Sequence, residues 1–274
     1  MVERFIQIFS MENITPFAVI TGASRGIGAE YARALATQGF DLLLVARDQN
    51  RLLELSKEIQ QTTSIQVWTE TLDLARPHAA EILYSLAQSF RPHVSLLVNN
   101  AGFGLYSLFA DMSLPTIQDM LQVHIHVTTE STRLFLPDMM NRRQGAIINV
   151  ASVAGFFPIP YMAEYAATKA FIISFSEAVA MEARERGVTI QVCCPGYTET
   201  DFHKTAGHCP RHMASPHTPR DVVQKSLKAL KSKQSLVTIG WQGLATHWIT
   251  PFIPKKWLMR LSARFVRPPN TLSH

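Results

Sequence analysis

The sequence has few charged residues and few cysteines. Charged side chains make up 17% of its 274 residues, and hydrophobic side chains make up 47%. An average globular domain has about 25% charged residues, and a disordered chain combines low hydrophobicity with high net charge, so disorder is excluded. Three cysteines, two of them adjacent at Cys193 and Cys194, are too few for a disulfide framework. They indicate a reducing, cytoplasmic setting.

The chain also lacks a run typical of a transmembrane helix. Two long uncharged runs, 144–163 and 234–254, contain prolines and side-chain amides that would leave polar groups unpaired in lipid. Residues 1–16 are expected to form an N-terminal extension without a signal-peptide pattern. No repeat or flexible linker marks a second domain. We therefore expect one domain, with residues 17–200 as its core and 201–274 as lid, last strand and basic extension.

What the sequence does contain is an alternation of short apolar runs and longer segments of helical period. Most of the runs are apolar throughout, which is the pattern of strands covered on both faces, and the segments between them suit crossover helices. The sequence therefore predicts an α/β fold with a doubly wound parallel sheet. Thr218, Pro219 and Asp221 predict a capped helix start late in the chain. The seven predicted strands are 17–22, 41–47, 66–73, 95–102, 145–152, 189–196 and 235–240.

A glycine-rich motif, TGASRGIG at 21–28, lies between the first predicted strand and a helical segment. Side chains at its glycines would block the approach of a pyrophosphate to the backbone N–H groups at the helix start. An ordinary glycine-rich turn is the alternative, but the strand before it and the helix after it favour nucleotide binding. The candidate residues of this loop are Gly22, Ser24, Arg25, Gly26, Ile27 and Gly28.

This glycine spacing resembles that of the short-chain dehydrogenase/reductase family. Further motifs follow in that family's order: Asp73 ends the third predicted strand, NNAG (99–102) ends the fourth, Ser152 ends the fifth, YAATK occupies 165–169 and PGYTET occupies 195–200. The resemblance covers about residues 17–200. It implies a single-domain Rossmann-type fold and an oxidoreductase that transfers hydride between a nicotinamide and a carbonyl or alcohol.

The candidate catalytic residues follow from these motifs. Tyr165 and Lys169 are one helical turn apart and share a face. An ammonium about 4 Å from the phenol would favour the phenolate by about 4 kcal/mol, or about 3 pKa units, so a lowered pKa of Tyr165 is expected. The resemblance implies that Tyr165 transfers the proton, that Lys169 also holds the nicotinamide ribose, and that Ser152 hydrogen-bonds the substrate oxygen.

The second predicted strand ends in Ala46 and Arg47, without the acid that would accept the ribose hydroxyls of NAD. Arg47 and Arg25 suit a clamp on a 2′-phosphate, so NADP(H) is the expected cofactor. The alternative is that Arg47 merely pairs with Asp48. The resemblance implies further cofactor contacts from Asp73 at the adenine, from Asn100, Ala101 and Gly102 at its ribose, and from Pro195, Gly196, Thr198 and Thr200, with Thr200 at the carboxamide.

One position departs from the family pattern. Family members commonly carry an Asn that orders a water joining the active-site lysine to solvent, and here that position is His124. Three interpretations compete: the imidazole replaces the relay and titrates near neutrality, it is a buried core histidine, or the relay is too damaged for turnover. The last interpretation leaves a second function open, an NADP-binding regulatory or scaffold protein.

The segments around the site predict the substrate. The apolar segment AGFFPIPYM, 154–162, favours an apolar or lipid-like ketone or secondary alcohol. Four histidines and a cysteine follow the PGYTET motif, but their spacings do not match structural zinc sites, so we expect an apolar lid and no metal. These residues are His203, His208, Cys209, His212 and His217.

The end of the chain carries most of the positive charge. Residues 202–274 hold twelve of the 26 Lys and Arg residues and one acid, Asp221. Residues 257–267 form a basic amphipathic helix in which Trp257, Leu258, Leu261 and Phe265 lie near one stripe. This helix either contacts a membrane or an acyl carrier, or its apolar stripe packs on the fold or on a second subunit.

The sequence also bears on nucleic-acid binding and on subunit assembly. Nucleic acid is not expected, because no recognition motif accompanies the basic residues. The resemblance implies a homodimer or homotetramer, since members of the family pair through helices that flank the active site. The location is predicted to be cytoplasmic, with membrane association through the C-terminal segment as an addition.

Overall fold

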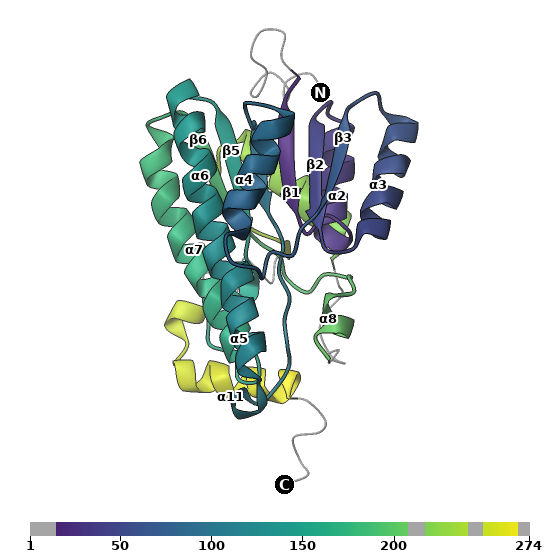
Figure 1. Ribbon diagram of the computed structural model, residues 1–274. Coiled ribbons are helices and arrows are strands. Elements are labelled where there is room, and N and C mark those ends of the chain that lie inside the picture. Colours follow the sequence, from purple (N-terminus) through teal and green to yellow (C-terminus); the bar gives the residue numbers. More distant parts are fainter. Residues whose placement is uncertain (1–14, 208–216, 241–248, 268–274) are drawn as a thin grey trace.

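The computed structural model describes residues 15–207, 217–240 and 249–267. Its centre is a parallel sheet of seven strands in the order β3-β2-β1-β4-β5-β6-β7 (Figure 1). β1 pairs with both β2 and β4, so the strand order reverses there, and such switch points form ligand crevices at the carboxyl ends of the strands. The strands are β1 (Phe17–Thr21), β2 (Asp41–Ala46), β3 (Val67–Thr71), β4 (Leu96–Asn99), β5 (Gly145–Val150), β6 (Val188–Cys194) and β7 (Leu236–Thr238).

Helices cover both faces of the sheet (Figure 1). Tyr31, Leu52 and Val222 join α2, α3 and α9 to one face. Leu83, Phe135 and further apolar side chains join α4, α6 and α7 to the other. The elements outside the sheet are α2 (Gly26–Ala36), α3 (Gln49–Thr62), α4 (Ala79–Phe90), η1 (Phe109–Asp111), α5 (Leu114–Leu121), η2 (Gln122–His126), α6 (Val127–Arg142), η3 (Val153–Phe156), α7 (Ala163–Arg184), α8 (Phe202–Thr205), α9 (Pro219–Lys231), η4 (Thr250–Phe252) and α11 (Lys255–Val266).

The seven predicted strands are confirmed, and so is the predicted start of α9. The Thr218 hydroxyl accepts from the backbone N–H of Asp221 (3.1 Å), and the Asp221 carboxylate accepts from the backbone N–H of Thr218 (3.0 Å). β3 lies at one edge of the sheet, and all its side chains are partly exposed, unlike those of the inner strands. Cys193 and Cys194 are buried on opposite faces, in different hydrophobic clusters.

The uncharged run 144–163 forms β5, η3 and the start of α7. Residues 241–248 of the second run lie outside the described part of the chain, as does most of the predicted N-terminal extension. Among the helices that the structure describes, none has the length and apolar character needed to cross a bilayer.

A row of buried polar side chains fixes α6 and α7 to the middle of the sheet. The Ser131 hydroxyl donates to Asn99 Oδ1, the Asn99 amide donates to Asn149 Oδ1, and the Asn149 amide donates to Ser176, each over 2.9 Å. Because burial makes an unmade hydrogen bond costly, this complete row holds both helices in one position. α7 carries the predicted catalytic tyrosine, so the row also positions the site.

Candidate active site

A cavity of about 850 Å³ runs along the carboxyl edge of the sheet, from the loops after β1 and β2 to α8 and the end of α11. This volume lies in the range of small-molecule sites. Of the predicted site residues, Gly28 and His124 are not part of its lining. The predicted residues that line it are Gly22, Ser24, Arg25, Gly26, Ile27, Arg47, Asp73, Asn100, Ala101, Gly102, Ser152, Tyr165, Lys169, Pro195, Gly196, Thr198 and Thr200.

Direct hydrogen bonds join the loop after β1 to the loop after β4. The Thr21 hydroxyl accepts from the backbone N–H groups of Asn100 (3.0 Å) and Ala101 (3.1 Å). The side-chain amide of Asn100 donates back to the carbonyls of Thr21 (3.0 Å) and Gly22 (3.2 Å). The two loops expected to hold the cofactor therefore form one bonded unit.

The glycines of the first motif are needed for this contact. Gly22 has φ +66°, and a Cβ there would lie 2.9 Å from the Cα of Ala101. A Cβ on Gly28 would overlap the carbonyl oxygen of Gly22. These two positions therefore require glycine even without a bound pyrophosphate, because the protein's own backbone already excludes a side chain there.

The start of α2 suits an anionic ligand. Its N-cap residue, Arg25, makes no capping hydrogen bond with its side chain, and the first turn contains no acid. Ser24, Gly26 and Ile27 line the cavity at this point. The first N–H groups of a helix and the positive end of its dipole attract phosphate. The residues present therefore fit the pyrophosphate of a dinucleotide.

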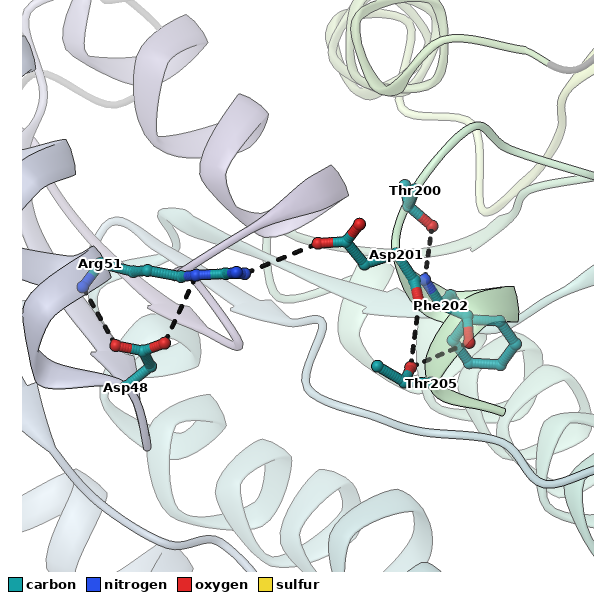
Figure 2. Close-up of polar contacts among 6 residues, drawn as sticks. All are labelled: Asp48, Arg51, Thr200, Asp201, Phe202 and Thr205. Atoms are coloured by element: carbon teal, nitrogen blue, oxygen red, sulfur yellow. Dashed lines mark hydrogen bonds and ion pairs between the residues drawn. The ribbon is translucent and has the colours of Figure 1, made fainter. Parts of the chain in front are cut away.

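Three arginines line the same end of the cavity, and they differ in how their charge is compensated. Arg51 lies 3.4 Å from the carboxylate of Asp48 and 3.6 Å from that of Asp201, as Figure 2 shows. Arg25 and Arg47 are exposed and form no ion pair with a described residue. The alternative pairing of Arg47 with Asp48 is therefore wrong, because Asp48 binds Arg51 and caps α3.

The segment after β6 folds over the middle of the cavity. The Thr200 hydroxyl accepts from the backbone N–H of Phe202 (3.3 Å), and Asp201, between them, points to Arg51 (Figure 2). The ring centroid of Phe202 lies 5.4 Å from that of Tyr165. This segment and α8 contact the nucleotide end through Asp201 and the candidate catalytic residue through Phe202, and their role as a lid stays a prediction.

α7 presents Tyr165 and Lys169 to the cavity from successive turns, and both are buried. The Lys169 ammonium lies 5.6 Å from the centroid of the Tyr165 ring and donates to the carbonyl of Val150 (3.0 Å). The side chain of Ser152, which follows β5, lies close enough to the Tyr165 hydroxyl to affect its pKa. The structure therefore brings together the three side chains that the sequence predicts as catalytic.

The expected lowering of the Tyr165 pKa is wrong for this arrangement. Burial raises the pKa of Tyr165 to about 12, and the nearby Ser152 side chain opposes only part of that rise. Burial also lowers the pKa of Lys169 to about 8. The attraction expected from the sequence requires an ammonium facing the phenol, whereas this ammonium faces the Val150 carbonyl and both groups are desolvated. At neutral pH, Tyr165 is therefore a protonated phenol.

His124 lies behind the cavity wall in η2, a π-helical turn, and is fully buried. Its Nε2 accepts from the backbone N–H of Phe103 (3.0 Å), and its Nδ1 contacts the Thr168 hydroxyl (2.8 Å). That hydroxyl donates onward to the carbonyl of Tyr165 (2.8 Å). The Nδ1 atom therefore carries the proton and is the donor.

These bonds contradict the relay interpretation of His124 in two respects. Both ring nitrogens bind protein atoms, so neither is left to hold a relay water. Burial and the nearby Lys169 charge lower the pKa of His124 well below its usual value, so the ring does not titrate near neutrality. The geometry agrees with the interpretation of a core histidine. The hydrogen bonds from His124 to Thr168 and from Thr168 to the Tyr165 carbonyl show how His124 supports Tyr165.

Apolar side chains form the opposite end of the cavity. Ile159 and Met162 come from the predicted substrate segment, and Tyr106 and Val266 join them in one hydrophobic cluster. Tyr106 and Val266 were not predicted, nor were Arg51 and Asp201 at the nucleotide end. Among these, only Val266 has a sequence signal, because it ends a second apolar stripe on the C-terminal amphipathic helix.

Only part of the histidine cluster after β6 lies within the described residues. His208, Cys209 and His212 lie outside the described residues, and the His203 side chain is not described. The backbone of His217 bridges to Thr198. Within the described ranges, no three metal-ligating side chains gather. The expectation of no metal stays a prediction.

The sequence matches the short chain dehydrogenase family over residues 16–209. A ketoacyl reductase of Nostoc sp. is 32% identical over 223 residues, which cover 81% of this chain and 77% of that relative. A very-long-chain 3-oxoacyl-CoA reductase of Bos taurus is 34% identical over 219 residues, covering 78% of this chain and 68% of the relative. A short-chain dehydrogenase of Sphingobium yanoikuyae, solved with NADPH, superimposes with a TM-score of 0.78 at 28% identity, covering 91% of this chain and 93% of that chain. The chain belongs to the short-chain dehydrogenase/reductase family and is a nucleotide-binding oxidoreductase.

Proposed function

We propose that this protein is an NADPH-dependent reductase of ketones that carry a long apolar substituent, such as a fatty acyl chain. The observation that carries the proposal is one continuous cavity with uncompensated guanidinium groups at one end, apolar walls at the other and Ser152, Tyr165 and Lys169 between them. Each part selects one component of the reaction: the cofactor, the substrate tail and the carbonyl group.

The charge at the nucleotide end supports NADP(H) over NAD(H). Arg25 and Arg47 are the uncompensated cations, and β2 ends at Ala46 with no acid to repel a phosphate. Guanidinium groups bind phosphate through paired, charge-assisted hydrogen bonds. Arg51 is already neutralised by Asp48 and Asp201, so we assign the 2′-phosphate to the other two arginines.

The protonation states support reduction as the direction at neutral pH. When bound, NADPH supplies the hydride. The Ser152 hydroxyl donates a hydrogen bond to the substrate oxygen and so stabilises the charge that develops there. Tyr165 is protonated, with a pKa of about 12, and therefore holds the proton that this oxygen must receive. Lys169, with a pKa of about 8, is mostly an ammonium at pH 7 and would hold the nicotinamide ribose when the cofactor is bound.

The walls of the substrate end support an apolar substituent. Tyr106, Ile159, Met162 and Val266 are all at least nine-tenths buried and meet in one cluster beside Tyr165. A hydrocarbon chain gains about 0.8 kcal/mol for each methylene that it buries, so such walls favour long substrates. The relatives named as ketoacyl and very-long-chain 3-oxoacyl-CoA reductases support the same class.

The experiment is a panel of methyl ketones and 3-oxoacyl thioesters of increasing chain length, with NADPH oxidation as the readout. We expect kcat/KM to rise with chain length, and NADH to be a poor substitute. NADPH binding without turnover on any member would instead support the scaffold function. A kcat/KM that falls with length would refute the apolar substrate class while leaving the reductase intact.

Subunit pairing and cellular location stay predictions. The family resemblance implies a homodimer or homotetramer, and α7 exposes Phe171 and Met181, which suits a contact through that helix. Light scattering on the purified full-length chain tests the pairing, with a monomer as the result that would refute it.

A further inference from the structure

α11 has two apolar stripes, and only one of them packs on the protein. Val266 is 4% exposed and joins the cluster at the substrate end. On the opposite side, Trp257, Leu261 and Phe265 are 68%, 54% and 46% exposed, and they follow one another at intervals of four residues. The outer stripe therefore does not pack on the part of the fold that the structure describes. An exposed stripe of large apolar side chains indicates an interaction surface.

Basic side chains flank the outer stripe. Arg260 and Arg264 each precede a residue of the stripe, and Lys255 and Lys256 lie at the start of the helix. All four are exposed and form no ion pair with a described residue. No acid occurs between residues 222 and 274 of the sequence. Long basic side chains can lie along apolar surface and extend their charge to a polar layer. The outer face thus presents apolar rings with cations beside them.

We infer that this outer face of α11 docks on the surface of an anionic lipid bilayer. A helix that lies in the interface places aromatic and aliphatic side chains at the acyl boundary and basic side chains at the headgroups, which is the arrangement of α11. Ile249 and Phe252, just before the helix, are 51% and 84% exposed and add apolar surface to the same segment. Each basic side chain near an anionic bilayer raises the affinity for the bilayer by up to about tenfold.

The place of α11 in the fold connects this surface to the cavity. The helix, yellow in Figure 1, lies at the end of the molecule far from the start of β1. Its last residue, Val266, lines the cavity together with Tyr106 and Met162. Docking would therefore set the substrate end against the bilayer, so that a lipid-like ketone reaches the cavity without crossing water. This last step rests on the proposed function, whereas docking itself does not.

Vesicle flotation with the full-length protein tests the inference. We expect the protein to bind phosphatidylcholine vesicles that contain roughly 30% phosphatidylserine, an anionic membrane surface. It should bind pure phosphatidylcholine vesicles weakly, and salt should release it from the anionic vesicles. W257S/L261S should weaken binding by at least about tenfold, because two large apolar side chains no longer enter the bilayer. The matched control L53S/I82S removes two similarly exposed apolar side chains from α3 and α4 and should bind normally.

A charge pair of variants completes the test. R260Q/R264Q should lower the affinity for the anionic vesicles, while K57Q/K228Q, on α3 and α9, should not. Equal binding of W257S/L261S and the parent, or no binding of the parent to anionic vesicles, would overturn the inference. So would a dimer in the parent that W257S/L261S converts to a monomer, because a second copy would then be the occupant. Turnover of a short soluble ketone is measured in parallel, so loss of the reductase and loss of docking are seen separately.

Discussion

The two ends of the cavity are built in different ways. The nucleotide end is polar, and its loops follow directly from β1, β2 and β4 and are bonded to one another through Thr21 and Asn100. The substrate end is apolar, and its walls come from remote segments that contribute one or two side chains each, such as Tyr106, Met162 and Val266. A parallel sheet therefore provides the first end almost by itself. The second end can change without disturbing the sheet.

The largest effect is expected where the two ends meet, at Tyr165. Replacing Tyr165 by Phe removes the proton donor but keeps the ring against Phe202, so kcat should fall by about 10²–10⁴-fold. NADPH affinity, measured by fluorescence titration, should stay within about twofold, because binding through the phosphates does not use the phenol. Turnover close to that of the parent would show that another group supplies the proton.

The nucleotide end is tested by comparing Arg47→Ala with Arg51→Ala. A charged hydrogen bond contributes about 1.5–3 kcal/mol, so loss of Arg47 should raise the KM for NADPH by about tenfold to a hundredfold and leave NADH nearly unchanged. Arg51 is neutralised by two carboxylates, so its loss should affect NADPH much less. Equal effects of the two substitutions would refute the assignment of the phosphate site.

The dependence on pH should be governed by Lys169. Its pKa of about 8 means that the ammonium is present below that pH and is lost above it. Reductase kcat/KM should therefore decline by up to about tenfold per pH unit above 8, whereas Tyr165, with a pKa of about 12, remains protonated throughout. A profile of kcat/KM from pH 6 to 10 with a non-ionising ketone measures this. A flat profile would remove the ammonium from the reaction.

The substrate end is tested by Val266→Phe. The larger ring should occupy space at the end of the cavity and raise the KM for long-chain ketones by about tenfold, a typical cost of misfit in an apolar pocket. A short ketone serves as the control, since it does not reach Val266 and should be turned over normally. If short and long substrates lose activity equally, the substitution has disturbed the fold.

The smallest effect on kcat is expected for His124→Asn. Asn can replace only one of the two hydrogen bonds, to Phe103 or to Thr168, so a loss of a few-fold in kcat is expected through the position of Tyr165. Because His124 is neutral in the assay range, the midpoint of the pH profile should not move. A shifted midpoint would restore the relay interpretation.

The comparison of the two ends also explains what could be predicted from sequence. The strands and the nucleotide loops are encoded by contiguous residues, so TGASRGIG and NNAG could be recognised directly. The Arg51–Asp201 ion pair and the wall formed by Val266 depend on segments that meet only in the folded protein. The prediction of a lowered pKa for Tyr165 was wrong for the same reason. The burial of Tyr165 depends on tertiary packing, which local spacing does not encode.

The π-helical turn η2 lets the helix around it carry one residue more than a regular helix would. A residue added to a regular α-helix would rotate α5 against α6 by about 100°, whereas a π-turn takes up the extra residue within one turn. Deleting one residue between Gln122 and His126 should therefore leave Met120 of α5 buried. The deletion would instead move His124 and break its hydrogen bonds to Phe103 and Thr168.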